Sequence, residues 1–206
     1  MKTRGLAMIA LAGLAAGAGF YAYQQRTPPA PPPAPLPPAA TLAATVPDFS
    51  LADRAGQMRS LHDWPGKALI VNFWATWCAP CRKEIPLLQK LQRERAADGF
   101  QVVGIAVDFR DKVLAYADEM KIDYPLLIGE QEALDAAAAF GVDAVGFPFT
   151  IFTDTQGRVV VAHMGELTQA EADLILGAVR SVDDGQQTLE QARARIASGL
   201  ATLPTT

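Results

Sequence analysis

The feature that most constrains this chain is a pair of cysteines at the junction between a predicted buried strand and a predicted helix. Cys78 and Cys81 are the only cysteines among 206 residues. Residues 68–73, just before them, are nearly all apolar, as in a strand that is buried on both faces. From Pro80 to about Ala97, apolar residues recur at helical spacing. Two thiols at this spacing can close or open a disulfide, so the junction predicts a dithiol redox site.

The chain after this junction predicts an α/β domain. Residues 101–107 form a second apolar run, so strand, helix and strand follow one another within about 40 residues. Such a unit pairs its strands in parallel through a right-handed crossover. The other predicted elements are helices at 112–120, 130–140 and 168–182, strands at 125–128, 149–153 and 159–163, and a helix at 189–198 whose role the sequence does not assign.

Composition and charge restrict the class of protein. Hydrophobic residues make up 50% of the chain and charged residues 19%, which is enough apolar material for a sizeable core. The formal net charge is −4, whereas a nucleic-acid-binding protein usually has a basic face. We therefore expect one domain of ordinary size with appendages, and no nucleic-acid partner.

The first 26 residues read as an export segment. Lys2 and Arg4 precede an uncharged stretch, 5–23, which as a helix would span about 28 Å, close to the thickness of a bilayer's hydrocarbon core. Positive charges on its N-terminal side place the rest of the chain outside the cytoplasm. The alternative is a cleaved signal peptide with a cleavage site at 16–18. Both interpretations export the chain, and we favour an uncleaved, single-pass anchor in the inner membrane with the catalytic domain in the periplasm.

A proline-rich linker follows the export segment at residues 27–45. Eight of the fifteen prolines lie between Pro28 and Pro38, so this stretch is expected to be extended polyproline II. At about 3.1 Å per residue, it would hold the next domain roughly 35–40 Å from whatever precedes it. A stiff spacer favours the anchor over the cleaved peptide. The globular domain is then expected over 46–182, with a tail at 183–206.

The position of each cysteine along the predicted helix indicates its role in the exchange. Cys78 is predicted at the N-terminal end of the helix, where free backbone N–H groups and the helix dipole stabilise a thiolate. Cys78 is therefore the expected attacking thiol, and Cys81 the thiol that resolves the mixed disulfide. A purely structural disulfide would close only a very small loop, worth about 2 kcal/mol. A zinc site would need four ligands, and the two histidines, His62 and His163, lack the required spacing, so no metal or cofactor is expected.

The sequence around the cysteines resembles a known superfamily. The pattern Trp74-x-x-Trp77-Cys78-x-Pro80-Cys81 after a buried strand resembles thioredoxins. The longer run at 72–86, Asn-Phe-Trp-Ala-Thr-Trp-Cys-Ala-Pro-Cys-Arg-Lys-Glu-Ile-Pro, is similar to the membrane-tethered TlpA/ResA/CcmG branch. The resemblance covers about residues 46–182. It implies a thioredoxin-like α/β fold with a central mixed sheet flanked by helices, a helix–strand–helix insertion at 109–139, and thiol:disulfide oxidoreductase activity.

The resemblance also implies roles for residues beside the cysteines. Pro148 matches a cis-proline that faces the disulfide, the alternative being an ordinary edge-strand proline. Phe147 is bulkier than expected there and bears on how a substrate fits. Trp77 is expected to flank the sulfurs, and Trp74 to belong to the core.

Glu84 is the remaining candidate, because it matches a glutamate that handles protons in this branch. The alternative is a solvated charge on the helix. Asn72 stands where ordinary thioredoxins bury an aspartate, which leaves Glu84 or water to take the proton of Cys81. His62, His163 and Asp108 are interpreted as structural or solvated and receive no role.

The function that the resemblance implies is reduction of client disulfides in the periplasm. The expected clients are apocytochrome c or the copper-site cysteines of an oxidase, and the expected electron donor is a membrane protein of DsbD/CcdA type. The dipeptide Ala79-Pro80 resembles the dipeptide between the cysteines of thioredoxin. This favours a low reduction potential of about −270 mV over a value near the −120 mV of DsbA.

Two other functions are less favoured by the sequence. The alternative from the binding class is a Cu(I)-handling protein in respiratory oxidase assembly, which would use the two thiolates as soft ligands. A thiol peroxidase is disfavoured, because the chain lacks a Pro-x-x-x-Thr-x-x-Cys arrangement resembling that of peroxiredoxins.

Overall fold

The structure is a computed structural model that describes residues 42–142 and 146–203, which lie in one compact unit. The predicted export segment and most of the predicted linker lie outside these residues. Within them, no helix combines the length and the apolar character needed to cross a membrane.

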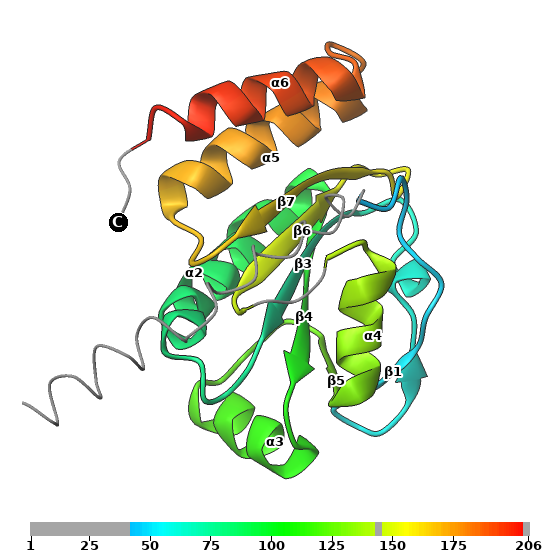
Figure 1. Ribbon diagram of the computed structural model, residues 1–206, viewed down its shortest axis with the longest axis vertical. Helices are drawn as coiled ribbons and strands as arrows, with labels where there is room; N and C mark the ends of the chain where they lie inside the picture. Colours follow the sequence, from blue (N-terminus) through cyan, green and yellow to red (C-terminus); the bar gives the residue numbers. More distant parts are fainter. Residues whose placement is uncertain (1–41, 143–145, 204–206) are drawn as a thin grey trace, which may run out of the picture. The chain divides into compact units, whose positions relative to one another are not determined.

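A seven-stranded mixed sheet forms the centre of the domain, in the order β2-β1-β5-β4-β3-β6-β7 (Figure 1). The three inner strands pair in parallel, β3 with β4 and β4 with β5. The pairings of β1 with β2, β1 with β5, β3 with β6 and β6 with β7 are antiparallel. The strands are β1 (Leu51–Asp53), β2 (Met58–Arg59), β3 (Ala68–Trp74), β4 (Phe100–Val107), β5 (Leu126–Gly129), β6 (Phe149–Thr153) and β7 (Val159–Met164). The predicted mixed sheet is thus confirmed.

Helices cover both faces of this sheet, because each inner strand is apolar on both sides. One core contains residues of α2 (Ala79–Arg95), α3 (Arg110–Glu119), α5 (Gln169–Asp183) and α6 (Leu189–Leu200). The other core contains residues of α4 (Gln131–Ala139) and a stack of Phe73 on Phe149, with ring centroids 4.5 Å apart. Alternate residues of β3 enter alternate cores, as strand geometry requires. The strand that precedes the cysteines is therefore held firmly from both sides.

Gly104 in β4 lies at a close approach between strand and side chains in the first of these cores. A Cβ atom there would lie 2.7 Å from Cδ2 of Leu126 and 3.0 Å from Cε2 of Tyr124. Both of those side chains are buried and have no room to move away. Glycine at this position lets the tyrosine ring pack beside β4.

Contacts with the domain begin earlier in the chain than the predicted boundary at residue 46. The backbone N–H of Ala43 donates to the carbonyl of Phe140 at 2.9 Å, and the N–H of Val159 donates to the carbonyl of Ala44 at 2.9 Å. Thr45 forms an isolated antiparallel bridge with Arg158. The last residues of the predicted linker are therefore bound to the sheet edge near β7.

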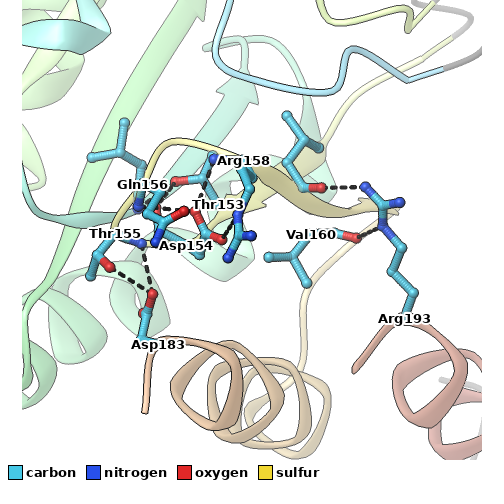
Figure 2. A network of polar contacts seen from close by, with 10 residues as sticks. Thr153, Asp154, Thr155, Gln156, Arg158, Val160, Asp183 and Arg193 are labelled. Atoms are coloured by element: carbon cyan, nitrogen blue, oxygen red, sulfur yellow. Dashed lines mark hydrogen bonds and ion pairs between the residues drawn. The ribbon is translucent and has the colours of Figure 1, made fainter. Parts of the chain in front are cut away.

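The C-terminal helix α6, which the sequence left without a role, lies against α5 and the edge strand β7 (Figure 1). Figure 2 shows how its Arg193 reaches the strand: the guanidinium donates to the carbonyls of Val159 at 2.7 Å and Val160 at 3.1 Å. Ala192 and Ile196 on the same helix are buried. The helix thus satisfies backbone acceptors of the edge strand, which also pairs with the segment around Thr45.

The β6–β7 turn is fixed by side chains of its own, also visible in Figure 2. The Asp154 carboxylate accepts from the backbone N–H of Gln156 at 3.0 Å and of Arg158 at 2.9 Å. The N–H and hydroxyl of Thr155 donate to the Asp183 carboxylate at the end of α5. The predicted hairpin is confirmed, and it is tied directly to α5.

Candidate active site

The two cysteines form a disulfide at the N-terminus of α2. Their sulfur atoms lie 2.00 Å apart and their Cα atoms 5.3 Å apart. Cys78 is the N-cap residue of α2, and the backbone N–H of Cys81 points at its sulfur, 3.3 Å away. Cys78 is 5% exposed and Cys81 is completely buried. The predicted positions are confirmed: the outer sulfur lies where helix N–H groups stabilise a thiolate, and the inner sulfur lies beneath it.

The two tryptophans before the cysteines differ in exposure, and the predicted core position of Trp74 is confirmed. Trp74 at the end of β3 is fully buried, whereas Trp77 is 65% exposed. The ring of Trp77 meets that of Phe147 edge-on, with centroids 6.0 Å apart. The peptide bond between Phe147 and Pro148 is cis, so the predicted geometry of this bond is confirmed. Trp77 and Phe147 therefore form one aromatic surface next to Cys78.

Glu84 lies on α2 one turn after Cys81, on the same side of the helix. Its side chain is buried, because the residue is only 2% exposed. One carboxylate oxygen accepts from Asn72 Nδ2 at 2.7 Å, and the other accepts from the backbone N–H of Leu167 at 2.8 Å. The interpretation of Glu84 as a solvated helix charge is therefore wrong.

Burial also changes the acidity of Glu84. Loss of solvation raises its pKa from 4.5 to about 7, although the hydrogen bonds from Leu167 and Asn72 act in the opposite direction. The nearby charge of Glu166 acts in the same direction as burial, and the pKa of about 7 is the net result of all these effects. A carboxyl group with a pKa near neutrality can both take and release a proton under ordinary conditions. This is the property required of a proton acceptor for a buried thiol.

The structure shows a polar network that sequence reasoning missed. Asn72 was noticed only for the acid that it replaces, but its amide donates to both Glu84 and the Thr150 hydroxyl, the latter at 3.0 Å. Leu167, the partner of the other Glu84 oxygen, carried no signal at all because it contributes only its backbone N–H. β3, α2 and the loop before α5 thus meet at one carboxyl group, and β6 is joined to it through Asn72.

Asp108 and the two histidines were given no role in the sequence analysis, and the structure shows where each of them lies. Asp108 is buried and its carboxylate accepts hydrogen bonds from Thr76, so of the two interpretations the structural one holds and the solvated one is wrong. His163 is buried and His62 is exposed. Within residues 42–142 and 146–203, no group of three or more His, Cys, Asp or Glu side chains could hold a metal ion.

The arrangement can exchange disulfides. A helix N-terminus that presents one sulfur, a second sulfur buried behind it, and a central mixed sheet flanked by helices together define a dithiol oxidoreductase of thioredoxin-like fold.

Comparison with known proteins agrees with this class. The chain belongs to the AhpC/TSA family, whose model matches residues 42–162. It is 37% identical over 132 residues to the thioredoxin-like protein YneN of Bacillus subtilis, covering 62% of this chain and 74% of that protein. It is 30% identical over 134 residues to the thiol-disulfide oxidoreductase ResA of Geobacillus thermodenitrificans, covering 65% and 75%.

Solved structures give the same result. A thiol:disulfide interchange protein of the thioredoxin family from Chlorobium tepidum matches with a TM-score of 0.59 and 34% identity, over 66% of this chain and 95% of that one. A secreted thiol-disulfide isomerase from Corynebacterium glutamicum matches with a TM-score of 0.59 and 32% identity, over 67% and 85%. The protein is therefore a TlpA/ResA/CcmG-like thiol:disulfide oxidoreductase, and its partners include proteins that carry disulfides.

Proposed function

We propose that the protein is a membrane-anchored reductase of client disulfides in the periplasm. The observation that carries the proposal is the asymmetry of the cysteine pair. Cys78 lies at the N-cap beside the exposed Trp77, whereas Cys81 is buried one turn further along α2, near a carboxyl group whose pKa is about 7. The outer sulfur can reach a client, and the inner sulfur can reach only Cys78.

The reaction begins from the dithiol. The Cys78 thiolate attacks one sulfur of the client's disulfide; a mixed disulfide forms and the client's other sulfur leaves as a thiolate. The Cys81 thiolate then attacks the Cys78 sulfur, which forms the intramolecular disulfide seen in the structure and releases the client's second sulfur. Two electrons pass to the client, whose two thiolates take up protons from water; the proton of Cys78 has already been lost to water, and that of Cys81 passes to Glu84.

Glu84 serves the second step in this scheme. Cys81 is buried, so its thiol needs an internal acceptor before it can attack. Glu84 follows on the same helix face, and its ionised form, held by Asn72 and Leu167, takes the proton of Cys81. Reduction of the disulfide by a donor runs the same steps in reverse and returns the proton.

Sequence features support the location and the partners. The uncharged segment at 5–23 with Lys2 and Arg4 before it supports an inner-membrane anchor, and the proline-rich stretch supports a periplasmic domain held away from the membrane. Resemblance to the TlpA/ResA/CcmG branch supports apocytochrome c or oxidase copper-site cysteines as clients, and hence a role in cytochrome c biogenesis or oxidase assembly. An oxidising compartment requires electrons to be delivered across the membrane, which supports a DsbD/CcdA-type donor.

Trapping of mixed disulfides tests the proposal. The full-length Cys81→Ala variant, expressed in its own host, cannot resolve the mixed disulfide and should accumulate adducts with its clients. The expected result is one or a few adducts that a reductant dissolves, each partner having a cysteine pair exposed to the periplasm. The matched Cys78→Ser/Cys81→Ala variant should form none. Adducts that do not depend on Cys78, or that involve only cytoplasmic proteins, would contradict the proposal.

A further inference from the structure

A hollow of about 380 Å³ is lined by Trp77, the residue before Cys78, and by Phe109, Val107, Leu134, the buried Asp108 and the polar Glu130 and Gln131. Trp77 is 65% exposed and Phe109 55% exposed, unlike most other large apolar side chains of the described residues. Trp77 immediately precedes Cys78, so one side of the hollow is formed by the residue next to the attacking cysteine in the chain. Exposed aromatic groups at such a place are typical of binding sites.

One carboxylate holds the backbone at both aromatic residues. The Oδ2 atom of Asp108 accepts from the backbone N–H of Thr76 at 3.2 Å and also from the Thr76 hydroxyl. Its Oδ1 atom accepts from the backbone N–H of Phe109 at 2.8 Å. The backbone N–H of Asp108 itself donates to the carbonyl of Gly129 at 3.2 Å. A single buried side chain, anchored to β5, thus connects the residue before Trp77 with Phe109.

The loop is held from the α2 side as well. Arg82 donates to the carbonyl of Thr76 at 3.0 Å, so the N–H, the hydroxyl and the carbonyl of Thr76 all have partners. The N–H of Cys78 donates to the carbonyl of Ala75 at 3.2 Å and closes the turn. Trp77 therefore stands on a fixed backbone although its ring is exposed. Aromatic side chains fixed before binding lose less conformational freedom when a partner docks.

We propose that Asp108 is a positioning residue that sets client preference, because it fixes Trp77 and Phe109 as walls of a hollow for an apolar side chain beside the client's reactive cysteine. The inference rests on the proposed attack of Cys78 on a client disulfide. It assigns the preference to apolar side chains, because Trp77, Phe109, Val107 and Leu134 supply most of the lining. Asp108 acts by fixing the backbone at Trp77 and Phe109, and it does not contact the sulfurs in this scheme.

Two disulfide-linked peptides provide the test. They share one sequence except that Leu flanks the cysteine in one and Ser flanks it in the other; hydroxyethyl disulfide serves as a probe without flanking residues. The reduced full-length protein in detergent should reduce the Leu peptide with a kcat/KM about tenfold above that for the Ser peptide. In Asp108→Asn this preference should fall to about twofold or less, through a higher KM for the Leu peptide.

Asp111→Asn is the matched control, because Asp111 is exposed on the first turn of α3 and lies three residues away. It should keep the wild-type preference. Equal losses in Asp108→Asn for both peptides, or no preference in the wild type, would overturn the inference. Failure of the wild type to reduce any of the three probes would instead overturn the proposed function.

Further variants distinguish a loss of positioning from a general loss of folding or activity. Thr76→Ser keeps both donors to Asp108 and should retain the preference, whereas Thr76→Val loses the hydroxyl donor and should lose part of it. Because Asp108 is proposed to act through both Trp77 and Phe109, Asp108→Asn should cost nothing more in a Trp77→Ala/Phe109→Ala background. Additive losses in that triple variant would contradict the inference.

Discussion

At the scale of single residues, the pairing of Asn72 with Glu84 is the unusual feature of this site. The amide of Asn72 can donate to a carboxylate, whereas an aspartate at the same place would put two carboxyl groups in contact. The buried carboxyl group is therefore carried by the helix one turn after Cys81 and not by the strand. Its pKa of about 7 makes it a proton acceptor whose charge depends on pH in the physiological range.

The raised pKa of Glu84 predicts a specific dependence of stability on pH. Between pH 4.5 and about 7, the folded protein keeps this proton while the unfolded chain releases it, so the free energy of unfolding falls as pH rises. Glu84→Gln lacks this dependence. The difference in unfolding free energy, variant minus wild type, should rise by up to about 3 kcal/mol between pH 4.5 and pH 8.

Chemical denaturation at several pH values measures this difference. Glu94→Gln, a change at an exposed position of the same helix, is the control and should track the wild type. Stability curves for Glu84→Gln and the wild type that stay parallel from pH 4.5 to pH 8 would show that Glu84 does not titrate as described.

The sequence could predict the positions of those site residues that belong to short motifs. The positions of the cysteines and of Trp74 follow from short patterns, the cis bond before Pro148 was expected from the resemblance to thioredoxins, and the structure places all of them accordingly. The environment of Glu84 could not be predicted in this way, because its partner Leu167 is 83 positions away and donates only a backbone group. Asp108 was missed for a similar reason, since its partner Thr76 belongs to another strand-to-helix connection.

At the scale of elements, most strands and helices were predictable because their apolar patterns are long. β3, β4 and α2 each contain many buried apolar residues, and the sequence predicted their bounds to within a few positions. β1 and β2 have only three and two residues, too few for a pattern, and they form only by pairing with each other and β5. The helix α6 was predicted, but its contact with β7 depends on the tertiary fold.

The contact between α6 and β7 predicts that Arg193 protects the edge of the sheet. Arg193→Ala removes the donors to Val159 and Val160 and should lower stability by about 1 kcal/mol. Amide hydrogen exchange should become faster in α6 and β7, and self-association should increase because the edge is open. Arg195→Ala on the exposed side of α6 is the control. Unchanged exchange in both segments would contradict this role.

At the scale of the whole molecule, the proposed anchor predicts where the domain works. A fusion of alkaline phosphatase to the C-terminus of the full chain, in a Gram-negative host, should be active and should remain in the membrane fraction. Deletion of residues 2–26 should leave the fusion inactive in the cytoplasm. An active fusion in the soluble periplasmic fraction would indicate a cleaved signal peptide, and an inactive full-length fusion would contradict export.

The central claim is that the Cys78–Cys81 pair works as a reductant, and its reduction potential tests this claim most directly. The full-length protein in detergent is equilibrated with glutathione buffers at pH 7, and the dithiol fraction is measured by thiol alkylation. The Ala79-Pro80 dipeptide between the cysteines predicts a potential of about −270 mV, near that of thioredoxin. A potential above about −150 mV would place the protein among oxidants and contradict the account.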